Sequence, residues 1–159
     1  MKLRVITTIF TLALALVASL VTFSLTPGVA SVSASDDQRQ RSLHLVKECT
    51  SYTGLAGSFC TFTSSNLAAI PVGSKVFYDQ AAGTPAGLLD SNVVLDAGGG
   101  NRGVGRCTLD FSTLLGLCTF SDGTGTLTGF HARLDVDCTA GIDRCRWDGP
   151  YSLTRDRDR

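Results

Sequence analysis

The chain has 159 residues, of which 43% are hydrophobic, and its 14 basic and 14 acidic side chains balance at neutral pH. This length predicts a single folded domain. The balanced charge excludes a protein built around a strongly basic nucleic-acid-binding surface, so no nucleic-acid partner is expected.

The N-terminal segment 1–34 is predicted to be a signal peptide. Lys2 and Arg4 precede an apolar run over 5–25, and small residues precede Ser35, as at a cleavage site. An uncleaved membrane anchor is the alternative, because the run is long enough to cross a bilayer. With cleavage, we expect a secreted, extracellular protein with no stable membrane association.

All six cysteines follow this segment, and an even number in an exported chain predicts three disulfides. Several connectivities are open in principle, and the short spacings favour sequence neighbours. The expected pairs are Cys49–Cys60, Cys107–Cys118 and Cys138–Cys145. A zinc site is the alternative, but the chain has no Cys-x-x-Cys pair and only His44 and His131 to add ligands, so no metal is expected.

The rest of the chain predicts an all-β domain, because short apolar runs are punctuated by glycine and no helical period persists. A polar, flexible arm is expected at 35–42. The strands expected after it are 45–52, 59–63, 75–78, 88–95, 104–111, 117–120, 125–138 and 145–153. Turns are expected at 71–74 and at Asp122-Gly123, the latter just before the longest strand.

The longest predicted strand has one apolar and one charged face. Its apolar residues are Phe130, Ala132, Leu134, Val136 and Cys138, and they alternate with His131, Arg133, Asp135 and Asp137. We expect the charged row to meet solvent. The alternatives are a polar row facing a ligand, or a catalytic pair formed by Asp135 and Asp137 at the spacing of inverting glycosidases.

Short strands with alternating faces are typical of a sandwich or a closed barrel, and only closure leaves no exposed edge. We therefore predict a single antiparallel β-barrel of about eight strands over 43–154, stabilised by disulfides. A disordered charged tail is expected at 155–159. Such a barrel is either filled with side chains or wide enough to hold one small ligand.

Four short motifs lie between residues 66 and 153. They are 73–79 (GSKVFYD), 103–107 (GVGRC), 118–127 (CTFSDGTGTL) and 147–151 (WDGPY). In this order they resemble the allene oxide cyclase and dirigent barrel superfamily. The resemblance implies an eight-stranded antiparallel barrel with a lumen for a hydrophobic molecule, in a superfamily with cofactor-free cyclases and proteins that steer radical coupling. The cyclases use a glutamate in the pocket, but the only glutamate here, Glu48, lies outside these motifs, so the catalytic residues stay unknown.

Two further patterns are considered as possible signs of an enzyme. Gly98, Gly100 and Gly103 have the spacing of a dinucleotide-binding loop, but that loop must open a helix, and here it leads into a predicted strand. We therefore expect a plain loop and no cofactor. There is no Gly-x-Ser-x-Gly elbow, so nothing in the sequence indicates a nucleophilic serine.

Five aromatic residues fall on the apolar positions of their predicted strands, and we expect them to share one interior. They are Tyr78, Phe111, Phe120, Phe130 and Trp147. They form either a plain core or the wall of a lumen around an apolar guest. The sequence thus predicts a secreted barrel that binds a small hydrophobic molecule. The alternatives are a cofactor-free cyclase or isomerase, and a structural or inhibitory protein with a filled barrel. The oligomeric state is left open.

Overall fold

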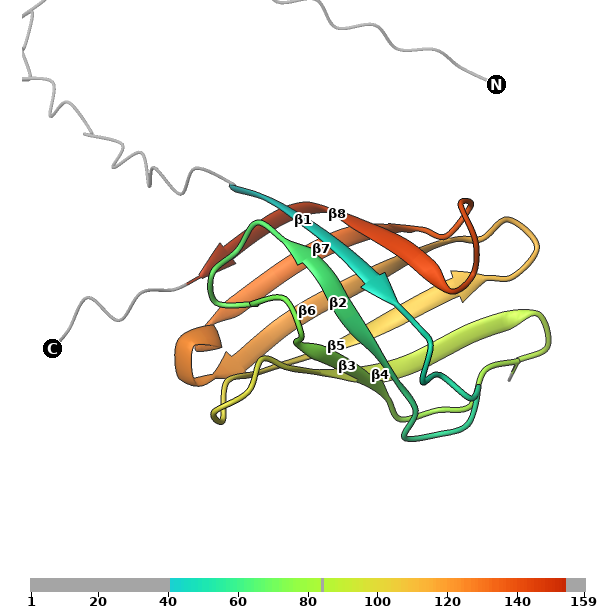
Figure 1. Cartoon of the computed structure of the whole chain (residues 1–159), viewed down its shortest axis with the longest axis horizontal. Helices are drawn as coiled ribbons and strands as arrows, with labels where there is room; N and C mark the ends of the chain where they lie inside the picture. Colours follow the sequence, from blue (N-terminus) through green and yellow to red (C-terminus); the bar gives the residue numbers. More distant parts are fainter. Residues whose placement is uncertain (1–40, 84, 154–159) are drawn as a thin grey trace, which may run out of the picture. The chain divides into compact units, whose positions relative to one another are not determined.

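The computed structural model describes residues 41–83 and 85–153, which form a closed antiparallel barrel of eight strands (Figure 1). The signal peptide predicted at 1–34 and the tail predicted at 155–159 lie outside the described residues. No helix in the described part of the chain is long and apolar enough to span a membrane.

Each strand pairs with its neighbours along the chain, and the pairing of β1 with β8 closes the barrel. The strands are β1 (Arg41–Glu48), β2 (Phe59–Ser65), β3 (Lys75–Tyr78), β4 (Leu88–Asp96), β5 (Arg102–Asp110), β6 (Leu115–Thr124), β7 (Phe130–Asp137) and β8 (Arg144–Leu153). One 3-10 turn, η1 (Gly125–Leu127), connects β6 to β7. The predicted all-β antiparallel barrel of about eight strands is confirmed.

The first strand begins and ends earlier than predicted. Arg41 and Ser42, which were expected at the end of the flexible arm, pair with Tyr151 and Pro150 of β8. The strand ends at Glu48, because the chain turns immediately after Cys49. The remainder of the predicted arm lies outside the described residues.

The turn before β7 also lies later than predicted. Asp122 and Gly123 continue β6, where Gly123 pairs with Gly103 of β5. The chain reverses instead between Gly125 and Gly129, which both adopt a positive φ, at 62° and 64°. Glycine tolerates this conformation without steric cost, so these two glycines fix the turn and shorten the predicted strand 125–138 to Phe130–Asp137.

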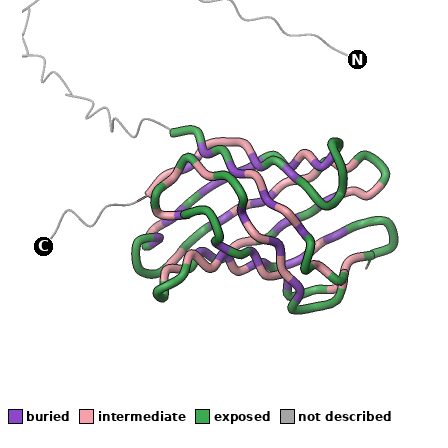
Figure 2. Tube along the Cα trace, viewed as in Figure 1, coloured by how far each residue is buried: buried purple, intermediate pink, exposed green. Residues whose placement is uncertain are grey.

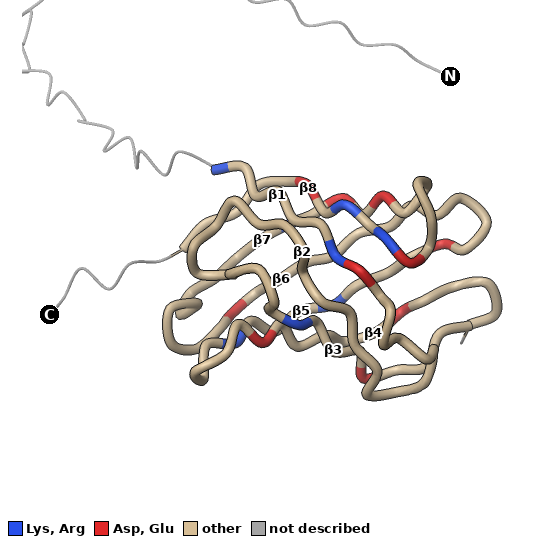
Figure 3. The backbone as a smooth tube through the Cα atoms, viewed as in Figure 1, with Lys and Arg blue, Asp and Glu red and all other residues tan. Residues whose placement is uncertain are grey.

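Buried and exposed residues alternate along the strands (Figure 2). In β7 the apolar row is buried, whereas His131, Arg133 and Asp135 are exposed, as predicted. Asp137 also lies on the outer side, where its carboxylate accepts a hydrogen bond from Arg146 at 3.0 Å. Figure 3 shows that the charged residues are spread over several strands of the barrel. The charged row of β7 therefore meets solvent and does not line the interior.

Two glycines of β5 bring the backbone close to interior rings. A Cβ atom at Gly103 would lie 3.3 Å from the ring of Phe130, and one at Gly105 would lie 2.9 Å from the ring of Phe120. At Gly105 it would also overlap the carbonyl oxygen of Thr119. Because glycine has no side chain at these two positions, the rings of Phe120 and Phe130 can pack closely against the backbone of β5.

The neighbour pairing of the cysteines is confirmed: the disulfides are Cys49–Cys60, Cys107–Cys118 and Cys138–Cys145. The first joins β1 to β2, and the third joins β7 to β8. Both lie at the barrel end formed by the loops 49–58, 79–87, 111–114 and 138–143, which we call the stapled end. The other end, where β1 begins and β8 ends, is called the terminal end (Figure 1). Three disulfides indicate an oxidising compartment.

Candidate functional site in the barrel interior

Four of the five aromatic residues predicted to share one interior do so. Tyr78, Phe120, Phe130 and Trp147 are buried inside the barrel. Phe111 does not belong to this group, because it lies in the turn after β5, only partly buried and packed against the edge of the core. That any of these residues binds a ligand stays a prediction.

Aromatic rings fill the middle of the barrel interior, beginning at Phe62 and Trp147, and continue toward the terminal end. The ring of Phe120 lies 5.4 Å from that of Phe130, measured between centroids, and 6.3 Å from that of Trp147. Phe62 meets Trp147 edge-on at 5.4 Å, and Tyr151 lies 6.5 Å from Phe130. We call these five residues the aromatic cluster. Its members contact one another directly, as in a packed core.

Toward the stapled end the interior contains a lysine, which the sequence analysis missed. Lys47 of β1 is only 5% exposed, although lysine is almost never fully buried without a partner. It follows Leu43 and Leu45 at the period of two that marks the inward face of a strand. The position of Lys47 in this alternation could have predicted that its side chain points inward. The sequence analysis missed it because it considered only apolar residues as interior candidates.

The Lys47 amine contacts polar and aromatic groups inside the barrel. Its Nζ donates to Tyr78 Oη at 2.9 Å, and lies 3.3 Å from Cys49 Sγ and 3.5 Å from Cys60 Sγ. It also lies 5.3 Å and 5.6 Å from the ring centroids of Tyr78 and Trp147. Among the described residues, no carboxylate oxygen lies within 4.0 Å of this nitrogen.

Burial shifts the pKa values of Lys47 and Tyr78. Removal from water disfavours the charged ammonium and lowers the pKa of Lys47 to about 7. Burial also raises the pKa of the Tyr78 phenol far above its ordinary value, with a smaller contribution from Tyr52. Near neutral pH, Tyr78 is therefore a neutral hydroxyl, while a substantial fraction of Lys47 is an uncharged amine.

Two more donors of this region have no hydrogen-bond partner in the structure. Tyr52, from the loop between β1 and β2, packs edge-on against Tyr78 with ring centroids 5.3 Å apart. Its Oη and the Nε1 of Trp147 are buried, yet neither forms a hydrogen bond. Unpaired buried polar atoms are uncommon in proteins. We call Lys47, Tyr52, Tyr78 and Trp147 the donor cluster, and its chemistry fits a guest that carries a hydrogen-bond acceptor.

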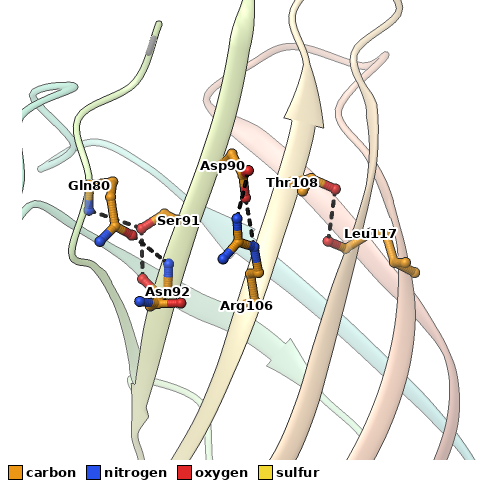
Figure 4. A network of polar contacts seen from close by, with 7 residues as sticks. All are labelled: Gln80, Asp90, Ser91, Asn92, Arg106, Thr108 and Leu117. Carbon is orange, nitrogen blue, oxygen red and sulfur yellow. Dashed lines mark hydrogen bonds and ion pairs between the residues drawn. The ribbon is translucent and has the colours of Figure 1, made fainter. Parts of the chain in front are cut away.

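Two hollows on the outer surface of the described part of the barrel have volumes of about 390 Å³ and 330 Å³. The larger one crosses β4, β5 and β6 and includes Arg106, whose guanidinium forms two hydrogen bonds to Asp90, at 2.9 Å and 2.8 Å (Figure 4). Beside it, Ser91 Oγ accepts a hydrogen bond from the backbone of Gln80 and donates one to that of Asn92. These polar groups are satisfied within the protein, so the hollow offers fewer free groups than the donor cluster.

The remaining sequence candidates lie outside the barrel interior. His44 pairs with Asp148 at 2.7 Å on the outer face, and both side chains are about half exposed. The loop containing Gly98 and Gly100 is a tight connection between β4 and β5, as predicted, and it opens no helix. The described residues contain no group of three or more His, Cys, Asp or Glu side chains arranged to hold a metal ion.

Comparison with known proteins yields no match to a family model, to a curated protein or to a solved structure. The barrel fold is therefore established from the structure itself. The arrangement that stands out within it is the donor cluster, in which an amine and three further donors are enclosed beside an aromatic core.

Proposed function

We propose that the protein is secreted and binds a small, largely hydrophobic molecule inside the barrel at the stapled end, in the manner of allene oxide cyclase and dirigent-like barrels. The observation that carries this proposal is the pair of buried, unpartnered donors, Tyr52 Oη and Trp147 Nε1. Leaving a buried polar group unsatisfied costs about 1–3 kcal/mol. A guest with an acceptor atom recovers that free energy on binding.

The surroundings favour a guest that is otherwise apolar. Apolar side chains at the stapled end are buried at Leu89, Leu109 and Val136. Four large apolar residues at the same end are exposed to solvent: Leu55, Leu88, Leu115 and Ile142. Together they give an apolar molecule contacts both inside the barrel and at its rim. Tyr52 of the 49–58 loop packs edge-on against Tyr78, so we expect this loop to move when a guest enters.

A filled barrel with a structural or inhibitory role is the second candidate, favoured by the mutual ring contacts of the aromatic cluster. A cofactor-free cyclase or isomerase differs from the binding function only in converting its guest. The enclosed Lys47 and Tyr78 supply polar groups for such chemistry. Detection of a retained guest, and then of its conversion, separates the three functions.

The test uses native mass spectrometry and the emission of Trp147, which is the only tryptophan of the chain. The oxidised protein is incubated with an extract of the medium in which its producer grows. We expect a retained small-molecule mass, and a shift of the Trp147 emission because this residue belongs to the donor cluster. A bare protein mass together with unchanged emission would favour the filled barrel.

A matched pair of variants locates the guest. Tyr52→Phe removes an unpartnered hydroxyl of the donor cluster, and we expect it to weaken retention while the fold is kept. Tyr151→Phe removes a hydroxyl from the aromatic cluster and serves as the control. Equal retention by both variants would place the guest away from Tyr52.

A further inference from the structure

We propose that Lys47 Nζ is a covalent attachment site, where an apolar aldehyde bound at the stapled end forms an imine with the amine. This inference rests on the proposed function, since the aldehyde must first enter the barrel interior. It adds a chemical class of guest and a bond between guest and protein.

The first argument concerns the nucleophile. An amine attacks a carbonyl only when its nitrogen is unprotonated, and an ion pair with a carboxylate would keep the proton in place. No carboxylate of the described residues lies within 4.0 Å of Lys47 Nζ. The contacts of this nitrogen are instead the Tyr78 hydroxyl, two disulfide sulfurs and two aromatic rings. The lowered pKa, about 7, agrees with this environment.

The second argument concerns the electrophile. When an amine adds to an aldehyde, negative charge develops on the carbonyl oxygen, and enclosed donors stabilise it. The donor cluster supplies such groups at Tyr52 Oη and Trp147 Nε1, both buried and without a partner. Tyr78 contributes a third hydroxyl, already bonded to the amine at 2.9 Å. The amine thus contacts the Tyr78 hydroxyl and the ring of Trp147 directly, and Tyr52 packs against Tyr78 beside it.

The reaction needs no oxidant or reductant. The lone pair of Nζ forms a bond to the carbonyl carbon, and the π electrons of the C=O bond move to oxygen. A proton passes from nitrogen to that oxygen, for which the Tyr78 hydroxyl is a suitable carrier. The resulting carbinolamine loses its hydroxyl, with a second proton from nitrogen, as one water. The product is the imine, and the bond hydrolyses by the reverse path.

The protein contains its own control amine. Lys75, at the start of β3, is exposed on the outer face, where its Nζ lies 4.5 Å above the ring of Phe59. Like Lys47, it lies over an aromatic ring, but it is exposed and is not part of the donor cluster. A difference in reactivity between these two lysines therefore reports the interior site and not a general property of lysine.

The experiment treats the full oxidised chain at neutral pH with decanal and sodium cyanoborohydride, which reduces an imine to a stable secondary amine. Peptide mapping then locates the added decyl chain. We expect labelling at Lys47 about ten times faster than at Lys75, because an enclosed neutral amine reacts preferentially. Excess 1-decanol, which has the same chain but no carbonyl, should slow the labelling of Lys47 and leave that of Lys75 unchanged.

The outcomes separate the two proposals. If decanol shifts the Trp147 emission while Lys47 is labelled no faster than Lys75, the imine is refuted and the binding function stands. If neither decanol nor decanal shifts that emission and Lys47 is not labelled, both are refuted for this class of guest. Lys47→Met should lose the fast labelling, while the slow labelling of Lys75 on the outer face stays unchanged. If Lys47→Met fails to fold, the decanol protection in the natural chain decides.

Discussion

The two halves of the barrel interior are built by the same strands, yet they differ in chemistry. Toward the terminal end, Phe120, Phe130 and Tyr151 pack ring against ring. Toward the stapled end, the same inward positions of β1 and β3 present Lys47 and Tyr78, and two buried donors lack partners. The alternation along a strand thus determines which side chains point inward. The types of residue at those inward positions determine whether that half of the interior is an apolar core or a candidate binding site.

The halves also differ in what stabilises them. Buried aromatic pairs contribute about 0.5–1.5 kcal/mol each beyond their area, so the contacts of the aromatic cluster favour folding. The donor cluster contains an amine removed from water, which opposes folding. Two of the three disulfides, Cys49–Cys60 and Cys138–Cys145, lie at that end and offset this cost. Two of the three covalent links therefore lie at the end that contains the buried amine.

The largest expected effect tests the aromatic cluster. Phe130→Ala should destabilise the fold by about 3–5 kcal/mol, because it empties the centre of a packed group of rings. The free energy of unfolding in urea measures this effect. A loss below about 1 kcal/mol would show that the rings are not packed as a core.

The second largest expected effect is the loss of stability when a disulfide is removed, compared between two disulfides that close loops of equal length. Cys49–Cys60 and Cys107–Cys118 each have a sequence separation of 11. Replacing either pair by alanine should cost about 3 kcal/mol through loop entropy. The loss should be greater for the first pair, because Lys47 also loses two sulfur contacts. An equal or smaller loss, measured by urea unfolding at one pH, would show that these contacts add no stability.

A third prediction concerns the pH dependence caused by Lys47. The unfolded chain holds the Lys47 proton up to a pKa of about 10.4, whereas folding lowers that pKa to about 7. Between these values the unfolded state binds more protons, so stability rises with pH. This contribution should increase by roughly 2–3 kcal/mol from about pH 6 to about pH 9.

Lys47→Met isolates this contribution, because other titrating groups affect both proteins equally. The variant should be more stable than the natural chain at about pH 6, and the difference should shrink toward about pH 9. Urea unfolding at both pH values gives the comparison. A constant difference would mean that Lys47 keeps its ordinary pKa in the folded protein.

The smallest expected effect serves as the outer-face control for Phe130. His131 is the next residue of β7 and points to solvent, so His131→Ala should change the free energy of unfolding by no more than about 0.5 kcal/mol. Thermal and urea unfolding of this variant beside Phe130→Ala provide the measurement. A loss of several kcal/mol would reverse the assignment of faces in β7.

The sequence predicted the parts of the fold that depend on local pattern. The alternation around Phe130 gave the faces of β7, and the short spacings gave the three disulfides. It misplaced the turn at Asp122-Gly123, because cross-strand pairing of Gly123 with Gly103 outweighs the local turn preference. Tertiary pairing of this kind is not visible in a short window of sequence.

The candidate site was only partly predictable. Tyr78 and Trp147 were placed in the interior from their strand positions, but Lys47 was missed even though it lies in phase with Leu43 and Leu45. Tyr52 could not be assigned, since it belongs to a loop, where no periodicity predicts which way a side chain points. Its contact with Tyr78 arises from the fold of the 49–58 loop over the barrel end.

The closure between β1 and β8 has a consequence for how the protein is made. Arg41 pairs with Tyr151, so the hydrogen bonds that complete the barrel join strands from opposite ends of the domain. Contacts between residues so distant in sequence slow folding, because the intervening chain must be ordered first. During synthesis, the barrel stays unclosed until β8 has left the ribosome. The delay agrees with the proposed secretion, since an unclosed chain can cross a membrane before its cysteines are oxidised.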